Sequence, residues 1–187
     1  MKSRRSSMLF AVSCLVAGPL LAQASPASEK ACSLLRPAEI EAVLGAKLDR
    51  PLAGMAVPAK KGAPRPAGET EWTCQGRAGT RAVSFFYGAE PATPEGKAKA
   101  AARLKAPQER LRAMGYAIKE TKLGATTCWT MTPPASHGDE PVAFGTACGG
   151  LKGDSFYSLS VSATGAGDLL GVEKVKVLAD KAAARLP

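Results

Sequence analysis

Alternating apolar and polar positions predict most of the strands in this chain. In the clearest run, 155–163, Tyr157, Leu159 and Val161 alternate with Phe156 and three serines. Side chains of a strand point to opposite faces in turn, so this strand has an apolar face and a serine-rich face. The serine-rich face indicates a side of the sheet that is partly wet, as antiparallel sheets allow. Further strands are predicted at 47–49, 71–75, 80–87, 116–123, 126–132 and 142–148, the second and third of these as a hairpin.

A short amphipathic helix is predicted at 37–44, directly after a cysteine. Pro37 suits the first turn of a helix, because its missing N–H would have no partner there. Glu39 places negative charge near the helix N-terminus, and Gly45 suits the left-handed residue that ends a helix. Cys32 precedes this helix and can fasten it to a distant strand.

Two longer helices are predicted at 93–114 and 168–186. Thr93 is a suitable N-cap for the first, and Pro107 lacks a backbone N–H, so a kink or two consecutive helices are expected there. The basic side chains on both helices are assigned to solvated outer faces, Arg185 among them. The predicted inner stripes are Ala100, Leu104, Leu111 and Met114 in the first helix and Val172, Val175, Ala179, Ala182 and Leu186 in the second.

Apart from the short 47–49 strand, the predicted order of elements is α-β-β-α-β-β-β-β-α. Hairpin-spaced strands interrupted by helices indicate an α+β fold, with a mainly antiparallel sheet and helices packed on it. Residues 25–187 are expected to form a single domain that begins with a loose tail at 25–30. The stretch 51–68 is rich in proline and glycine and resists both helix and sheet, so it is predicted to be a loop.

The first 24 residues have the pattern of an export signal. Lys2, Arg4 and Arg5 precede an apolar run at 8–21, and Ala22-Gln23-Ala24 provides a cleavage motif. Cleavage near Ala24-Ser25 would release a periplasmic or secreted protein, because no second apolar segment is long enough to span a membrane. General and twin-arginine export both remain open.

Four cysteines remain after cleavage, and an even number in an exported protein indicates two disulfides. Cys128 and Cys148 lie in two strands joined by a Pro/Gly-rich connection, so a hairpin would bring them face to face. Cys32 is then expected to pair with Cys74, although four cysteines permit three connectivities. No Cys-x-x-Cys pair is present, so metal ligation and redox chemistry are not predicted, and no cofactor is expected.

The formal net charge is +9, and removing the three basic residues of the export signal leaves 9 − 3 = +6. This charge has two interpretations: ordinary surface charge that keeps the protein in solution, which is favoured, or attraction to anionic neighbours such as lipid head groups, envelope polymers or acidic proteins. Lys60, Lys61 and Arg65 lie in the 51–68 loop, which has two interpretations: an arm that contacts an anion, or an ordinary surface loop. Nucleic acid is not an expected partner, because the chain is exported and lacks interleaved aromatic and basic residues.

A family resemblance rests on the segment Cys-Ser-Leu-Leu-Arg-Pro-Ala-Glu-Ile-Glu-Ala-Val-Leu-Gly at 32–45, on a later Trp-x-Cys strand and on a further cysteine pair. The chain resembles small exported bacterial domains of unknown function, known from actinobacterial lipoproteins, and is similar to the extracellular sensor domain of a mycobacterial Ser/Thr kinase. The resemblance implies an antiparallel sheet with helices, internal disulfides and a ligand cleft without catalysis. Cys14 lacks a lipoprotein signal around it, so membrane tethering is not implied. The matching residues are Cys32, Leu34, Leu35, Glu39, Leu44, Gly45 and Cys74.

No catalytic signature is visible, and the chain is not predicted to be an enzyme. The favoured hypothesis is a periplasmic binding or sensing module for a small molecule, envelope polymer or envelope protein. Its pocket is expected between sheet and helices, lined by aromatics such as Trp72, Trp129, Phe85 or Tyr157. The alternatives are a small hydrolase that uses Ser155 or His137, and an adaptor subunit of an envelope complex.

Overall fold

A seven-stranded antiparallel sheet forms the centre of the molecule. The structure is a computed structural model that describes residues 26–55, 71–135 and 143–187. Within these ranges the strand order across the sheet is β1-β2-β3-β7-β6-β5-β4. The strands are β1 Ala53–Met55, β2 Glu71–Ala78, β3 Arg81–Ala89, β4 Ala117–Leu123, β5 Thr126–Thr132, β6 Phe144–Lys152 and β7 Ser155–Ala163.

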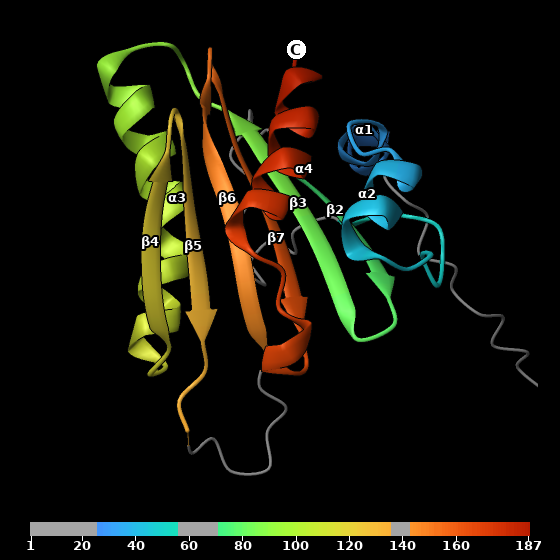
Figure 1. Ribbon diagram of the computed structural model, residues 1–187. Coiled ribbons are helices and arrows are strands. Elements are labelled where there is room, and N and C mark those ends of the chain that lie inside the picture. The colour runs from blue at the N-terminus through green and yellow to red at the C-terminus, as the bar shows by residue number, and fades with distance from the viewer. Residues whose placement is uncertain (1–25, 56–70, 136–142) are drawn as a thin grey trace, which may run out of the picture.

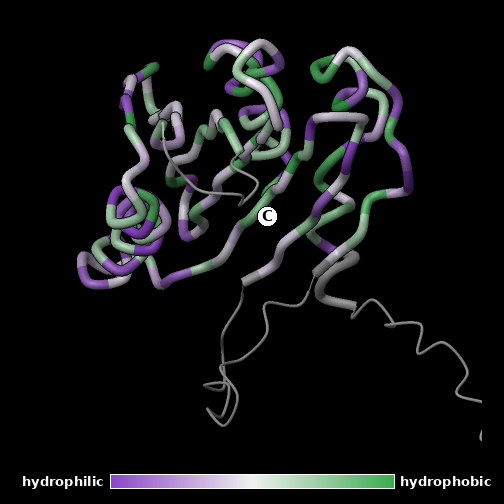
Figure 2. Tube along the Cα trace, turned by 90° about the horizontal axis from the view of Figure 1, so that it is seen from below, coloured by the Kyte–Doolittle hydropathy of each residue, from purple (hydrophilic) through white to green (hydrophobic). Residues whose placement is uncertain are grey.

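Helices cover both faces of the sheet. The helices are α1 Pro26–Ser33, α2 Pro37–Leu44, α3 Pro94–Ala113 and α4 Val172–Ala184, and a 3-10 turn, η1, covers Ala166–Asp168. Helices α1, α2 and α4 lie on one face, and α3 lies on the other (Figure 1). Figure 2, which looks along the strands, shows the same separation of helices by the sheet. The predicted α+β class, with helices packed on an antiparallel sheet, is confirmed.

The hydrophobic core lies between the sheet and the helices α1, α2 and α4. Strand register places Phe85 opposite Leu159, and Leu159 opposite Cys148, so these side chains form one row across the sheet. From the helices, Ile40, Val175 and other apolar side chains complete the cluster and are fully buried. The period-two pattern predicted for β7 is therefore the pattern that packs the core.

Both predicted disulfides are present. Cys128 and Cys148 are direct partners in the register of β5 and β6, with a Cα–Cα distance of 4.0 Å. Cys32 and Cys74 join α1 to β2 with a Cα–Cα distance of 5.0 Å. The bonds close sequence separations of 20 and 42 residues, for which the chain-entropy model gives about 3 and 4 kcal/mol of stabilisation.

The N-terminal part differs from the prediction in three places. Residues 26–30 of the expected loose tail instead belong to α1, since the Cys32–Cys74 bond and the fully buried Ala31 hold this segment against the sheet. The strand expected at 47–49 is absent from this part of the described chain. Strand β1 instead forms at 53–55, inside the predicted loop, where it pairs with the edge of β2. The remainder of that loop, 56–70, lies outside the described residues.

Helices α3 and α4 follow the sequence signals with a few exceptions. Thr93 caps α3 by accepting a hydrogen bond from the backbone N–H of Gly96, and α3 continues as one helix through Pro107. Met114 is not part of an inner stripe: it follows the end of the helix and is 54% exposed. Helix α4 begins at Val172, later than predicted, because the preceding residues form η1 and an extended connection.

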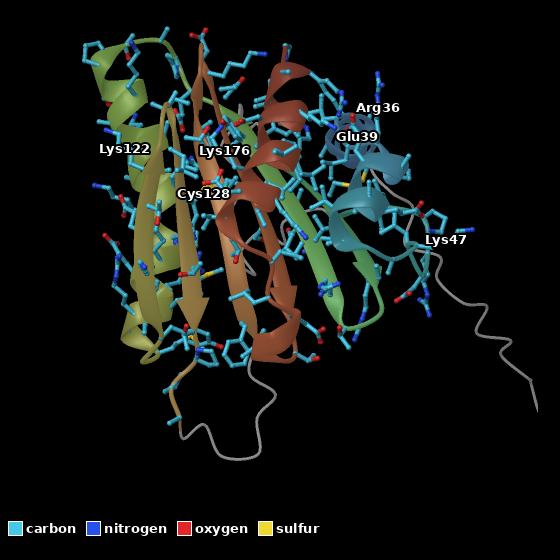
Figure 3. The ribbon with its side chains drawn as sticks, viewed as in Figure 1. Arg36, Glu39, Lys47, Lys122, Cys128 and Lys176 are labelled. Carbon is cyan, nitrogen blue, oxygen red and sulfur yellow. A yellow bond between two sulfur atoms is a disulfide. The ribbon has the colours of Figure 1, made fainter. Side chains whose placement is uncertain are left out.

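An ion pair fastens the C-terminal end of α4 to the start of α2. Arg185 donates to the Glu39 carboxylate over 2.6 Å and to the backbone carbonyl of Leu34 over 2.9 Å. Arg185 is thus not on the solvated face that was predicted for it. Glu39 lies among the helices on this side of the sheet (Figure 3), and its side chain is 19% exposed. The hydrogen bond from Arg185 lowers the pKa of Glu39 below its ordinary value of 4.5.

We expect Arg185→Met to lower the free energy of unfolding by about 1–3 kcal/mol at pH 7, because it leaves a half-buried carboxylate without its charged donor. Since the folded-state pKa of Glu39 is lowered, the contribution is complete above pH 4.5 and disappears as the pH falls through the lowered pKa. Urea denaturation of the wild-type protein and the variant at several pH values from 7 to 3 measures this difference in the free energy of unfolding. Lys174→Met on the exposed side of α4 is the control. A difference between the variants that stayed constant down to pH 3 would contradict the assignment.

The hydroxyl of Tyr87 is buried without a hydrogen-bond partner among the described residues. Its ring stacks on Trp72 with centroids 4.7 Å apart and on Phe85 at 5.9 Å, so the side chain is held by its aromatic part. Burial raises the pKa of Tyr87 above its ordinary value of 10.0.

Tyr87→Phe should leave the stability unchanged or raise it by up to about 1 kcal/mol, because it removes an unsatisfied polar group and keeps the ring. Tyr157→Phe is the comparison, since the Tyr157 hydroxyl lies 3.3 Å from the Thr126 hydroxyl and its removal should cost about 1 kcal/mol. Thermal unfolding of both variants measures the difference. Greater destabilisation by the Tyr87 change would show that this hydroxyl has a partner.

Candidate functional site

The sheet face beneath α3 carries small and polar side chains over β6 and β7. The register aligns Ser84, Ser160, Ala147 and Trp129 in one row across β3, β7, β6 and β5. These residues alternate with the core residues of the same strands, so they point toward α3. The sheet surface beneath the helix therefore carries short side chains in its middle, and the Trp129 ring on β5 borders it. We call this surface the floor.

Helix α3 is fixed over this floor at its N-terminal half. Arg103 forms an ion pair with Glu90, with 3.1 Å between Nε and Oε1, and its guanidinium lies 6.0 Å from the centre of the Phe156 ring. Ala100 is buried, and the Thr93 cap defines the start of the helix. These contacts hold the N-terminal half of α3 in place beside β3 and β7.

A cavity of about 550 Å³ remains between α3 and the sheet, and we call it the α3 cavity. Its volume lies within the range of about 300–1,000 Å³ that is typical of small-molecule sites. It far exceeds the roughly 30 Å³ that one water occupies, and interior packing normally leaves few such voids. The lining residues are Ser84, Phe86, Trp129, Met131, Ala147, Ser158 and Ser160 from the sheet and Arg103, Leu104, Ala106, Pro107, Arg110 and Leu111 from the helix.

A second hollow of about 300 Å³ lies on the other side of α3, toward β4. Leu104 and Trp129 line both hollows, so this pair forms the partition between them. On the floor of the second hollow, Gly149 lies close to the backbone of β7. The space beneath α3 therefore consists of two chambers with one shared wall.

A third hollow, of about 620 Å³, lies at the β1–β2 edge and is lined by residues such as Asp49, Arg50 and Arg77. Most of its lining is exposed, whereas Trp129 and Ala147 in the α3 cavity are only 4% and 2% exposed. A ligand in the α3 cavity would lose more contact with water than one at this edge. The α3 cavity is thus the better candidate site.

Of the predicted pocket aromatics, only Trp129 lines the α3 cavity. Phe85 and Tyr157 belong to the core on the opposite face of the sheet, and Trp72 packs against that core with Lys30 5.3 Å from its ring centre. A pocket between the sheet and the helices was predicted from the sequence, but three of the four aromatic residues named for it lie on the core face of the sheet, opposite the α3 cavity.

Of the other predicted site residues, the structure describes only Ser155, which does not line the α3 cavity. Lys60, Lys61, Arg65 and His137 lie outside the described residues. Ser155 is 6% exposed at the start of β7 and adjoins a hollow of only about 10 Å³. The hydrolase and adaptor hypotheses stay predictions that the described residues do not test.

Several lining residues were missed in the sequence. Arg103 and Arg110 were assigned to a solvated face of α3, although both line the α3 cavity. A signal was available: together with Pro107 they recur at spacings of three and four residues, which defines one side of a helix. The alternation of β3 likewise places Phe86 with the serines rather than with the core.

The chain matches no known family model and no curated protein. The resemblance to actinobacterial lipoproteins and a kinase sensor domain therefore stays a prediction. Over the described ranges, no helix has the length and apolar character needed to cross a membrane. In the same ranges, no three His, Cys, Asp or Glu side chains are grouped so that they could hold a metal ion.

Gly149→Ala should lower the stability by about 1–3 kcal/mol, because a Cβ there would lie 2.4 Å from the backbone oxygen of Tyr157 and 3.2 Å from the Ser158 Cα. Chemical denaturation measures the loss. Gly167→Ala in η1 is the control, since a Cβ there meets nothing within 4 Å. If both variants unfold at the same denaturant concentration, the described approach of β6 to β7 is wrong.

Proposed function

We propose that this protein is a non-catalytic binding module of the cell envelope or exterior, and that it holds a small organic molecule in the α3 cavity. The observation that carries the proposal is the contrast between the two faces of the sheet. One face is filled by a continuous apolar core, whereas the other supports a helix above a cavity of about 550 Å³.

The character of the lining supports binding rather than empty space. Trp129, Phe86 and Met131 supply apolar surface, and serine hydroxyls with arginines supply a few polar groups. This mixture of mainly apolar walls and few polar groups is typical of small-molecule sites. Ser160 already donates to the backbone oxygen of Ser84 over 3.4 Å, which orders part of the floor.

The extracytoplasmic assignment rests on the N-terminal sequence and on the disulfides. Two disulfides are typical of proteins that fold in oxidising compartments. The Cys128–Cys148 bond joins the strands next to the α3 cavity and thereby stiffens its floor. A stiff, covalently fastened floor favours binding because less conformational entropy is lost when a ligand enters.

The proposal predicts that the protein purified from its own host carries a small molecule, released by denaturation and detectable by mass spectrometry. Ser160→Leu should remove at least most of this molecule, because the larger side chain fills the floor of the α3 cavity. Ser162→Leu is the matched control: it lies on the same face of β7 but does not line the cavity.

Loss of the molecule from Ser160→Leu alone would support the proposal. Equal amounts in both variants would place the molecule elsewhere and contradict the proposed site. A wild-type protein with no bound molecule, and with no rise in melting temperature in extracts of its host envelope, would contradict the function itself.

A further inference from the structure

We infer that the ligand of the α3 cavity is an elongated apolar molecule with one anionic group, and that Arg110 binds this group. The inference rests on the proposed binding function and names the ligand class for the same site. Its starting point is charge: the lining of the α3 cavity contains two guanidinium groups and no carboxylate. Such a lining attracts anions and disfavours cations.

The two arginines differ in what they already contact. Arg103 forms an ion pair with Glu90 and lies over the Phe156 ring, so its positive charge is already balanced by groups of the protein. Among the described residues, Arg110 forms no ion pair, and it is exposed at the mouth of the α3 cavity. Its planar guanidinium can donate two parallel hydrogen bonds to a carboxylate or a similar anion.

The spacing of the two arginines along α3 favours an elongated apolar ligand. Arg103 and Arg110 are separated by seven residues of one helix, or about 10 Å along its axis. The helix residues that line the cavity between them are Leu104, Ala106 and Pro107, and Leu111 follows Arg110; none of these four has a side-chain hydrogen-bond donor. The aromatic surface of Trp129 and Phe86 lies on the floor. A chain of about ten carbons would cover this length.

Strongly polar ligands fit this lining less well. A sugar carries many hydroxyl groups, each of which needs a partner when it leaves water. The α3 cavity offers three serine hydroxyls and the guanidinium groups, and one of these hydroxyls already donates within the sheet. One anionic group at the mouth and an apolar remainder inside would satisfy the residues that are present.

Three probes with the same chain length test the inference: decanoate, decanol and decyltrimethylammonium, all below their aggregation concentrations at pH 7.5. The chain has two tryptophans, so Trp72→Phe leaves Trp129 as the sole reporter of the α3 cavity. Calorimetric titration of the wild-type protein provides a second measurement that does not depend on this substitution. We expect decanoate to bind about tenfold tighter than decanol and the cation to bind most weakly.

Arg110→Gln should remove the preference for decanoate over decanol, whereas Arg112→Gln, an exposed change on the same helix outside the cavity lining, should keep it. Equal affinity of wild type for decanoate and decanol, an unchanged preference in Arg110→Gln, or no binding of decanoate would each overturn the inference. The proposed function is judged separately, by the molecule that co-purifies with the protein, and it would survive binding of decanol alone.

Discussion

Every side chain of a strand in this sheet must point to one of two faces, and the chain fills these faces unequally. Large apolar groups such as Phe85 and Leu159 point toward α1, α2 and α4, where they are fully buried. The intervening positions of the same strands carry mainly serine, alanine and glycine, together with Phe86 and Phe156. A one-residue shift in register would exchange the two sets, so the core also determines which residues face α3.

Covalent and ionic contacts keep this division in place at the margins of the sheet. The Cys32–Cys74 bond holds α1 on the core side, and the Arg185–Glu39 pair joins α4 to α2. On the other side, Arg103 and Glu90 hold α3 above a floor that it does not fill. The buried apolar cluster thus lies on the side of α1, α2 and α4, while the α3 side retains an unfilled space of about 550 Å³.

The sequence predicted the fold well where local signals and burial agree. The alternation in 155–163, the Thr93 cap and the facing cysteines all specify local geometry that the structure retains. It failed at β1, which is only three residues long and forms because the edge of β2 is available, a tertiary effect without a local signal. Apart from Trp129, the cavity lining was also missed, since a positively charged helix face has the same sequence pattern whether it borders water or a cavity.

A crystal structure of the protein purified from its own host, without added ligand, would test the central claim most directly. We predict that α3 stands off the sheet, with the α3 cavity open and containing electron density for a bound molecule between Arg110 and Trp129. A structure in which α3 had moved onto the serines of β7 and closed the space, leaving Leu104 and Leu111 packed on the floor, would contradict the account.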